Sequence, residues 1–255
     1  MLAKIETLPT LEWGHGEQAF VFLHYFGGSA ASWKWVFEQM PNYRCIAISL
    51  PGFGGTPAPE QPSLQYYTEA VCATIAHLAL KNYTLVGHSM GGKIALNVAV
   101  EAEQKPQKVV LIAPSPATTE PMPDDEKERM LKNHPSEENA KTTIEGATKQ
   151  PLNEEQYTLA IQTHTIVDNG VWRWWLLEGM NHSIADRVSQ LSIPVVVLAS
   201  QDDPVIPCDK IQSDVIDIIP NSRLIATKNV GHLIPLEATE WVVKQLQKIT
   251  VELET

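Results

Sequence analysis

The chain is poor in several features that mark particular classes of protein. Its cysteines are only Cys45, Cys72 and Cys208, and their odd number and irregular spacing argue against a disulfide framework and against a zinc site. No stretch approaches the ~20 consecutive apolar residues that a membrane-spanning helix needs. The sequence also has no internal repeat and no low-complexity linker. A globular enzyme is the simplest class that remains.

Basic residues are also scarce relative to acidic ones. The chain has 19 Lys and Arg against 30 Asp and Glu, which gives a formal net charge of −11. A field of that sign opposes binding to nucleic acids and to anionic membranes. Residues 1–9 lack the apolar stretch of a signal peptide. We therefore expect a cytoplasmic protein with a small-molecule substrate, no nucleic-acid or membrane partner, and a monomeric or small homo-oligomeric state.

Metal ligands at a typical spacing are missing as well. No group of His, Cys, Asp and Glu residues has the spacing of a zinc site, so we expect neither a metal nor a cofactor.

What the sequence does contain is an alternation of strand and helix patterns over its 255 residues. Apolar and β-branched runs predict strands at 19–24, 44–50, 83–86, 108–113, 193–199 and 223–226. Helical patterns fall at 63–80, 92–100 and 238–249. Such alternation predicts an α/β fold with a mainly parallel, doubly wound sheet and helices on both of its faces. Catalytic loops are expected at the carboxyl ends of the strands.

One segment interrupts this alternation. Residues 115–190 hold acidic stretches, several prolines and no convincing strand. We predict a helical cap insert over 115–190, and an α/β core formed by 1–114 and 191–255.

The most informative motif is the pentapeptide Gly87-His88-Ser89-Met90-Gly91. It has the form G-x-S-x-G and lies between a predicted buried strand and a helix rich in small residues. Strand, sharp turn and helix is the context of a nucleophile elbow, in which flanking glycines relieve crowding and the helix N-terminus favours negative charge. Ser89 is therefore the candidate nucleophile. The alternative is a plain strand-to-helix turn whose serine caps the helix.

A serine nucleophile needs a base, and the base needs an acid to orient it. His232 is the strongest candidate base, because it lies in a glycine-flanked loop between a short predicted strand and a helix that starts with proline. The strand 193–199 runs into Asp202 and Asp203, and position within that loop does not decide which of the two is the acid.

Two backbone N–H groups are also expected, to stabilise the negative oxygen of an acyl-transfer intermediate. The N–H of Met90, directly after the nucleophile, is one. The loop after the first predicted strand supplies the other, and Phe26 is our choice within His24-Tyr25-Phe26-Gly27-Gly28. Gly27 allows the backbone to approach substrate closely.

With these motifs in view, nearly the whole chain resembles the α/β-hydrolase superfamily. The resemblance rests on the elbow, the loop 23–28, the turn 50–56, the stretch 203–207 and Gly231-His232. It implies the order Ser89, Asp203, His232, and it selects Asp203 over Asp202. The family usually has His-Gly where this chain has His24-Tyr25, so Tyr25 is expected to narrow the pocket or to lend it a hydroxyl. A serine nucleophile argues against haloalkane dehalogenases and epoxide hydrolases, which resemble this fold but use aspartate.

These expectations describe a carboxylesterase-like serine hydrolase acting on a small to medium, partly apolar ester. Tyr25, Gly27, Trp172 and Trp175 are candidate substrate contacts, although we favour packing of the insert onto the core as the role of the tryptophans. A triad-bearing small-molecule receptor with slow turnover stays open. So do perhydrolase or haloperoxidase-like, thioesterase and lactonase activities, since each needs the same triad.

Overall fold

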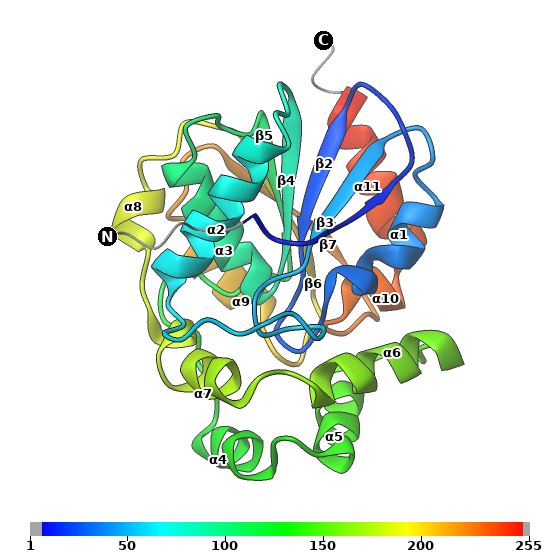
Figure 1. The fold of residues 1–255 in the computed structure, drawn as a ribbon, viewed down its shortest axis with the longest axis vertical. Coiled ribbons are helices and arrows are strands. Elements are labelled where there is room, and N and C mark those ends of the chain that lie inside the picture. Colours follow the sequence, from blue (N-terminus) through cyan, green and yellow to red (C-terminus); the bar gives the residue numbers. More distant parts are fainter. Residues whose placement is uncertain (1–6, 252–255) are drawn as a thin grey trace.

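The computed structural model of the chain describes residues 7–251 (Figure 1). Its strands are β1 (Thr10–Trp13), β2 (Ala19–Leu23), β3 (Arg44–Ile48), β4 (Tyr83–His88), β5 (Lys108–Ile112), β6 (Val195–Ser200) and β7 (Ser222–Thr227). Its α-helices are α1 (Lys34–Glu38), α2 (Leu64–His77), α3 (Met90–Glu101), α4 (Asp124–Asn133), α5 (Glu137–Ala147), α6 (Glu154–Thr165), α7 (Asn169–Leu177), α8 (Ala185–Val188), α9 (Cys208–Ile211), α10 (Ile234–Glu237) and α11 (Thr239–Val251). Two short 3₁₀ helices are η1 (Ala30–Trp33) and η2 (Gly179–Asn181), and η3 (Gln212–Ile216) is a short π-helix.

The strands form one sheet in the order β1-β3-β2-β4-β5-β6-β7. All neighbouring pairs are parallel except β1 with β3, which pair antiparallel. The predicted α/β class with a mainly parallel, doubly wound sheet is therefore confirmed. Every predicted strand is present, with ends that differ by a few residues. The edge strand β1 was not predicted, because all four of its residues are exposed and carry no apolar run.

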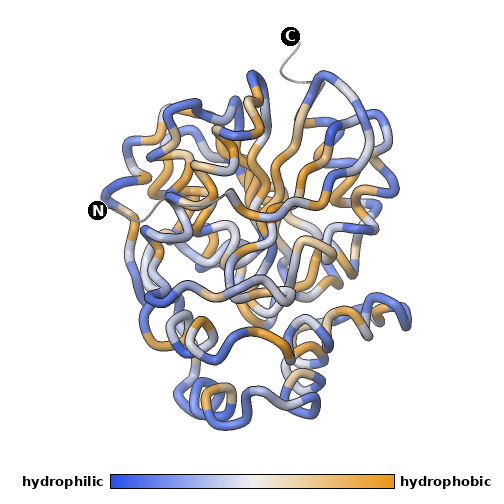
Figure 2. Tube along the Cα trace, in the orientation of Figure 1, coloured by the Kyte–Doolittle hydropathy of each residue, from blue (hydrophilic) through white to orange (hydrophobic). Residues whose placement is uncertain are grey.

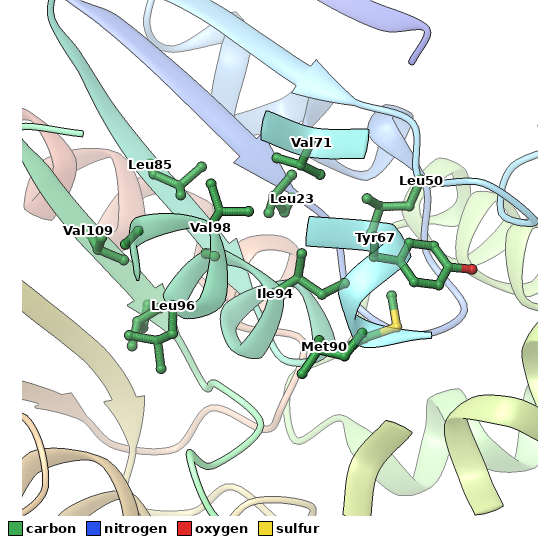
Figure 3. Packing of buried hydrophobic residues seen from close by; sticks show 14 of the residues in the cluster. Leu23, Leu50, Tyr67, Val71, Leu85, Met90, Ile94, Leu96, Val98 and Val109 are labelled. Carbon is green, nitrogen blue, oxygen red and sulfur yellow. The ribbon is translucent and has the colours of Figure 1, made fainter. Parts of the chain in front are cut away.

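Side chains alternate between the two faces of the sheet, and each face has its own apolar core. Leu23, Leu85 and Val109 pack beneath α2 and α3 on one face, which Figure 3 shows from close by. Phe22 and Val110 face the other side, where they meet residues of α1 and α11. Figure 2 shows the strands as mainly apolar stretches of chain and the outer turns as polar ones. Burial on both faces explains why the inner strands are apolar without interruption.

Helices α4 to α7 lie together across one end of the sheet (Figure 1). Local capping defines their starts: Ser136 caps α5, Asn153 forms a capping box with Gln156 on α6, and the Asp168 carboxylate accepts from the N–H groups of the first turn of α7. Trp174 of α7 stacks on Tyr67 of α2 with ring centroids 5.1 Å apart, so this helical layer is anchored to the core. The layer comes from the segment 115–190 and covers the end of the sheet where Ser89 lies.

Within residues 7–251, no helix is both long enough and apolar enough to span a membrane.

Candidate active site

Ser89 occupies a strained turn between β4 and α3. Its backbone has φ 52° and ψ −120°, a region that non-glycine residues rarely adopt. The turn is held by hydrogen bonds from Ser89 N–H to the Ile112 carbonyl at 3.0 Å and from Gly92 N–H to the Ser89 carbonyl at 2.8 Å. Strain of this kind persists only where the surroundings fix it, and it commonly marks a functional position.

The glycines beside Ser89 are required by close backbone contacts. A Cβ on Gly87 would lie 2.4 Å from the Gly91 carbonyl oxygen. A Cβ on Gly91 would lie 2.5 Å from the Leu23 oxygen and 2.6 Å from the His24 oxygen. The elbow therefore packs directly against the backbone that follows β2, which is the loop expected to carry the second N–H donor.

The structure brings Ser89, His232 and Asp203 into one hydrogen-bonded chain. Ser89 Oγ lies 2.9 Å from His232 Nε2, and His232 Nδ1 lies 2.9 Å from Asp203 Oδ2. The other oxygen of Asp203 accepts from the N–H groups of Val205 and Ile206 at 2.8 and 3.0 Å. All three side chains are buried. This arrangement favours the tautomer in which Nδ1–H donates to Asp203 and Nε2 is free to accept the serine proton.

The neighbouring aspartate has a different place. Asp202 Oδ2 accepts from the N–H of Asn229 at 2.7 Å and does not reach the imidazole. Asp202 therefore braces the turn before His232, whereas Asp203 contacts the ring.

The charges of this pair shift their pKa values in opposite directions. Burial by itself disfavours both charged forms, but the Asp203 charge and its hydrogen bond outweigh burial and raise the pKa of His232. Conversely, His232 and the two backbone N–H donors hold the pKa of Asp203 below its ordinary value despite burial. The pair thus combines an ionised acid with a base of increased proton affinity.

Phe26 and Met90 are the two residues expected to supply N–H donors. Phe26 lines the same cavity as Ser89, and Met90 begins α3 directly after it. His24 fixes the loop from below: its Nδ1 donates to the Tyr25 carbonyl at 2.9 Å, and its Nε2 accepts from Leu50 N–H at 3.3 Å. Burial lowers the pKa of His24 to about 4, so this brace stays neutral.

The loop that carries His232 is held from two sides. From the core, His88 Nε2 donates to the His232 carbonyl at 2.9 Å. From the helical layer, the His232 N–H donates to the Ala147 carbonyl at 2.7 Å. A Cβ on Gly231 would lie 2.4 Å from the same Ala147 oxygen, so glycine is required there.

Glu237 completes this contact between the loop and the helical layer. Its Oε2 accepts from the N–H groups of Lys149, Gln150 and Gly231 at 2.7, 2.9 and 2.8 Å, and its Oε1 accepts from Leu233 N–H at 3.0 Å. One carboxylate thereby joins both sides of His232 to the segment after α5. The sequence gives no local signal for this role, because Lys149 and Glu237 are 88 residues apart.

A cavity of about 410 Å³ opens above Ser89 and His232. Its walls come from the loop after β2, from α4 to α7 and from the stretch after Asp203. A larger surface hollow of about 660 Å³, between α1 and α6, contains none of the three residues. The cavity beside Ser89 is the one that contains Ser89 and His232, and its volume lies within the range of small-molecule sites.

The candidate substrate contacts fall into two groups. Tyr25 and Trp175 line the cavity. Gly27 and Trp172 are not among its lining residues: Gly27 has φ +88° and its open side is filled by the His164 ring, while Trp172 lies against Phe26 with centroids 4.5 Å apart. Trp172 thus supports the loop of Phe26 from behind.

Several polar residues of the cavity were not singled out from the sequence. Glu120 and His164 are buried in its wall. Arg129 is held by Glu126, with Nη2 2.5 Å from Oε1, and by Thr143. An acidic segment rich in proline gave no pattern that would distinguish Glu120 or Glu126 from solvent-exposed charges. In the described part of the chain, no group of three or more His, Cys, Asp and Glu side chains is arranged to hold a metal ion.

Comparison with known proteins identifies the family and the fold. A model of the alpha/beta hydrolase family matches residues 20–245. An esterase from Exiguobacterium antarcticum has the same fold, with a TM-score of 0.85 over 95% of this chain and 94% of that one, at 19% identity. At 19% identity, this likeness shows a shared fold and does not extend to function.

Two curated relatives extend the comparison. A Mycoplasma pneumoniae protein provisionally named esterase/lipase 2 is 36% identical over 104 residues, and the match spans only 39% of either chain. A Bacillus subtilis protein provisionally named 2-succinyl-6-hydroxy-2,4-cyclohexadiene-1-carboxylate synthase is 26% identical over 240 residues, which is 88% of this chain and 86% of the relative.

Proposed function

The chain belongs to the alpha/beta hydrolase family, and from this premise we propose that it is a serine hydrolase that cleaves a small to medium, partly apolar ester. The observation that carries the proposal is the continuous chain from Ser89 Oγ through both ring nitrogens of His232 to Asp203, with each step at 2.9 Å. Nucleophile, base and orienting acid are within hydrogen-bond reach before any substrate is bound, as acyl transfer requires.

In the proposed reaction, Ser89 Oγ attacks the ester carbonyl carbon while His232 Nε2 takes the serine proton. Asp203 keeps the ring oriented and stabilises the imidazolium that forms. The N–H groups of Phe26 and Met90 donate to the oxygen that becomes negative, and each such donor contributes about 3–4 kcal/mol of barrier lowering in comparable sites. His232 then protonates the leaving alcohol. Water, deprotonated by His232, releases the acid and restores Ser89.

The helical layer formed by 115–190 supports this proposal as a cap over the site. Residues of α4 to α7 complete the cavity wall above Ser89, and Trp175 and Met130 supply apolar surface for the substrate. The cap excludes water from the reacting carbonyl, which strengthens every charge interaction in the site.

The test is hydrolysis of p-nitrophenyl esters with acyl chains of two to eight carbons by the wild type and by Ser89→Ala in parallel. We expect turnover by the wild type alone, with a preference for the chain lengths that a cavity of about 410 Å³ admits. Equal turnover by both proteins would contradict the assignment of Ser89. Saturable binding without turnover by either would instead support the receptor alternative.

A further inference from the structure

The cavity beside Ser89 is mostly apolar, but three of its polar side chains, Tyr25, Glu120 and His164, have buried atoms without partners. Met122, Ile144 and Val205 are typical of its lining. Against this background, Glu120 Oε2 and both ring nitrogens of His164 have no hydrogen-bond partner among residues 7–251. Neither residue takes part in the proposed triad. Buried polar groups that lack partners cost stability, so their retention in a cavity wall points to a partner that arrives with the ligand.

Glu120 is held rigidly in the segment after β5. Only 6% of the residue is exposed. Its N–H donates to the Met180 carbonyl at 2.9 Å, and the following Pro121 restricts the backbone further. Glu120 is therefore held in the cavity wall by a fixed backbone.

The nearest cation does not provide the missing partner of Glu120. Lys93 Nζ donates to the carbonyls of Thr118, Met180 and His182 at 2.9, 3.1 and 3.0 Å. An ammonium group has three donors, so these contacts use all of them. Burial raises the pKa of Glu120, and a hydrogen-bonding contribution from Ser115 together with the charges of Lys93 and His232 offsets only part of that rise. A carboxyl group in this setting suits a hydroxyl partner, which can both donate and accept, better than a second charge.

His164 lies on a different wall of the cavity, in α6. It is 2% exposed, and its ring stands edge-on to Trp172 with centroids 4.8 Å apart. A Cβ on Gly27 would lie 2.5 Å from its Nδ1, so the ring rests on the loop after β2. Burial lowers the pKa of His164 to about 3, and the neutral ring offers one donor and one acceptor.

The sheet places these two groups on either side of the nucleophile. Strand β4, which leads to Ser89, lies between β2 and β5. His164 packs on the loop after β2, and Glu120 follows β5. We propose that Glu120 and His164 are specificity-determining residues that bind hydroxyl groups of the substrate on opposite sides of its scissile carbonyl, and that the substrate is an uncharged hydroxy ester. This inference rests on the proposed esterase function.

Two matched pairs of esters test the proposal. Ethyl 3-hydroxybutyrate against ethyl butyrate probes a hydroxyl in the acyl part, and 3-hydroxypropyl butyrate against propyl butyrate probes one in the alcohol part. Hydrolysis is followed by acid release at constant pH. We expect the wild type to prefer the hydroxylated member of each pair at least tenfold in kcat/KM, because a site built around a hydroxyl discriminates against the analogue that lacks it.

Variants then separate the two positions. Glu120→Leu is expected to erase the preference for the hydroxylated ester in one of the two pairs and to keep it in the other. His164→Phe is expected to erase the preference that Glu120→Leu keeps, and to keep the one that Glu120→Leu erases. Glu120→Gln and His164→Gln, which retain hydrogen-bonding groups, should restore most of the lost preference. The matched control is Glu128→Leu, which removes an exposed glutamate from α4 outside this cavity. A purely structural role would lower all four rates together. The proposal would be overturned if the wild type showed a kcat/KM ratio near one between the two esters of each pair. It would also be overturned if both variants kept the wild-type ratios.

Binding to Ser89→Ala, measured by calorimetry, keeps this outcome separate from the esterase proposal. We expect each hydroxy ester to bind at least tenfold more tightly than its partner, with the difference lost on adding Glu120→Leu or His164→Phe. Selective binding without wild-type hydrolysis would reject the esterase function and retain the hydroxyl site. Hydrolysis without selectivity in either measurement would reject the hydroxyl site alone.

Discussion

The backbone N–H of His232 donates to the carbonyl of Ala147 at 2.7 Å, so the candidate base is hydrogen-bonded to the helical layer above it. Ala147 is the last residue of α5, and the contact joins the loop after β7 to the segment 115–190. The position of the imidazole therefore depends on the docking of that segment as well as on the core.

Glu237 is expected to be the main element of this docking. Replacing it with alanine leaves backbone N–H groups on both sides of the contact without their acceptor. We expect Glu237→Ala to lower kcat about tenfold or more and to reduce the free energy of unfolding by about 1–3 kcal/mol. Steady-state kinetics and urea denaturation measure the two effects. Glu240→Ala, on the exposed surface of α11, is the control, and a kcat unchanged in Glu237→Ala would contradict the positioning role.

Gly231 tests the same contact by steric means. In Gly231→Ala, the new methyl group would lie 2.4 Å from the Ala147 oxygen and 2.8 Å from the Lys149 nitrogen, both backbone atoms that move with difficulty. We expect kcat to fall by about 100-fold, since displacement of a reacting group by about 1 Å has effects of this size. Gly146→Ala serves as the folding control, because nothing lies within 4 Å of its Cβ position and helix propensity should raise stability. Full activity in Gly231→Ala would show that the loop is not fixed by this contact.

The pH profile follows from the shifted pKa of His232. The reaction needs the neutral ring, so kcat/KM should rise with pH through the His232 pKa of the free enzyme. Because Asp203 raises that pKa, the midpoint should lie above the ordinary histidine value of 6.5. Asp203→Asn should move the midpoint to lower pH and reduce kcat by about 10⁴-fold. Asp202→Asn should leave the midpoint in place, and a midpoint that responds to Asp202 instead would reverse the assignment of the two aspartates.

The strain at Ser89 predicts a difference between two inactive variants. Alanine retains the unfavourable positive φ, whereas glycine adopts it without a Cβ clash. Ser89→Gly should therefore be more stable than Ser89→Ala by about 1 kcal/mol in chemical denaturation. At the exposed Ser189, where φ is −60°, the order of the same two substitutions should be the opposite. Equal free energies of unfolding for Ser89→Gly and Ser89→Ala would mean that the backbone turn relaxes when the serine side chain is absent.

The parts of the fold that follow local rules were predictable from the sequence. The buried strands and the elbow turn are encoded by apolar runs and by glycines at points of close contact. The edge strand β1 was missed because an exposed strand such as Thr10–Trp13 needs no apolar pattern. Ser89 and His232 were proposed because each lies in a loop after a strand, whereas the family resemblance selected Asp203 over Asp202. Glu237 was not predicted, because Lys149 and Gln150, the partners that lie in the helical layer, are far away in the sequence. Glu120 was not predicted, because its acidic, proline-rich segment has no pattern that distinguishes it from solvent-exposed charges. Trp174 stacks on Tyr67 of a distant helix, and such a contact has no local sequence pattern.

The most direct measurement of the central claim is the covalent labelling of Ser89 by diethyl p-nitrophenyl phosphate, followed by intact mass and peptide mass spectrometry. An ordinary serine does not react at neutral pH, whereas a serine activated by a neighbouring imidazole does. We predict a single diethylphosphoryl adduct on the peptide that contains Ser89, at a rate reduced at least 100-fold in His232→Ala. No adduct, or an adduct on another residue of the wild type, would contradict the account.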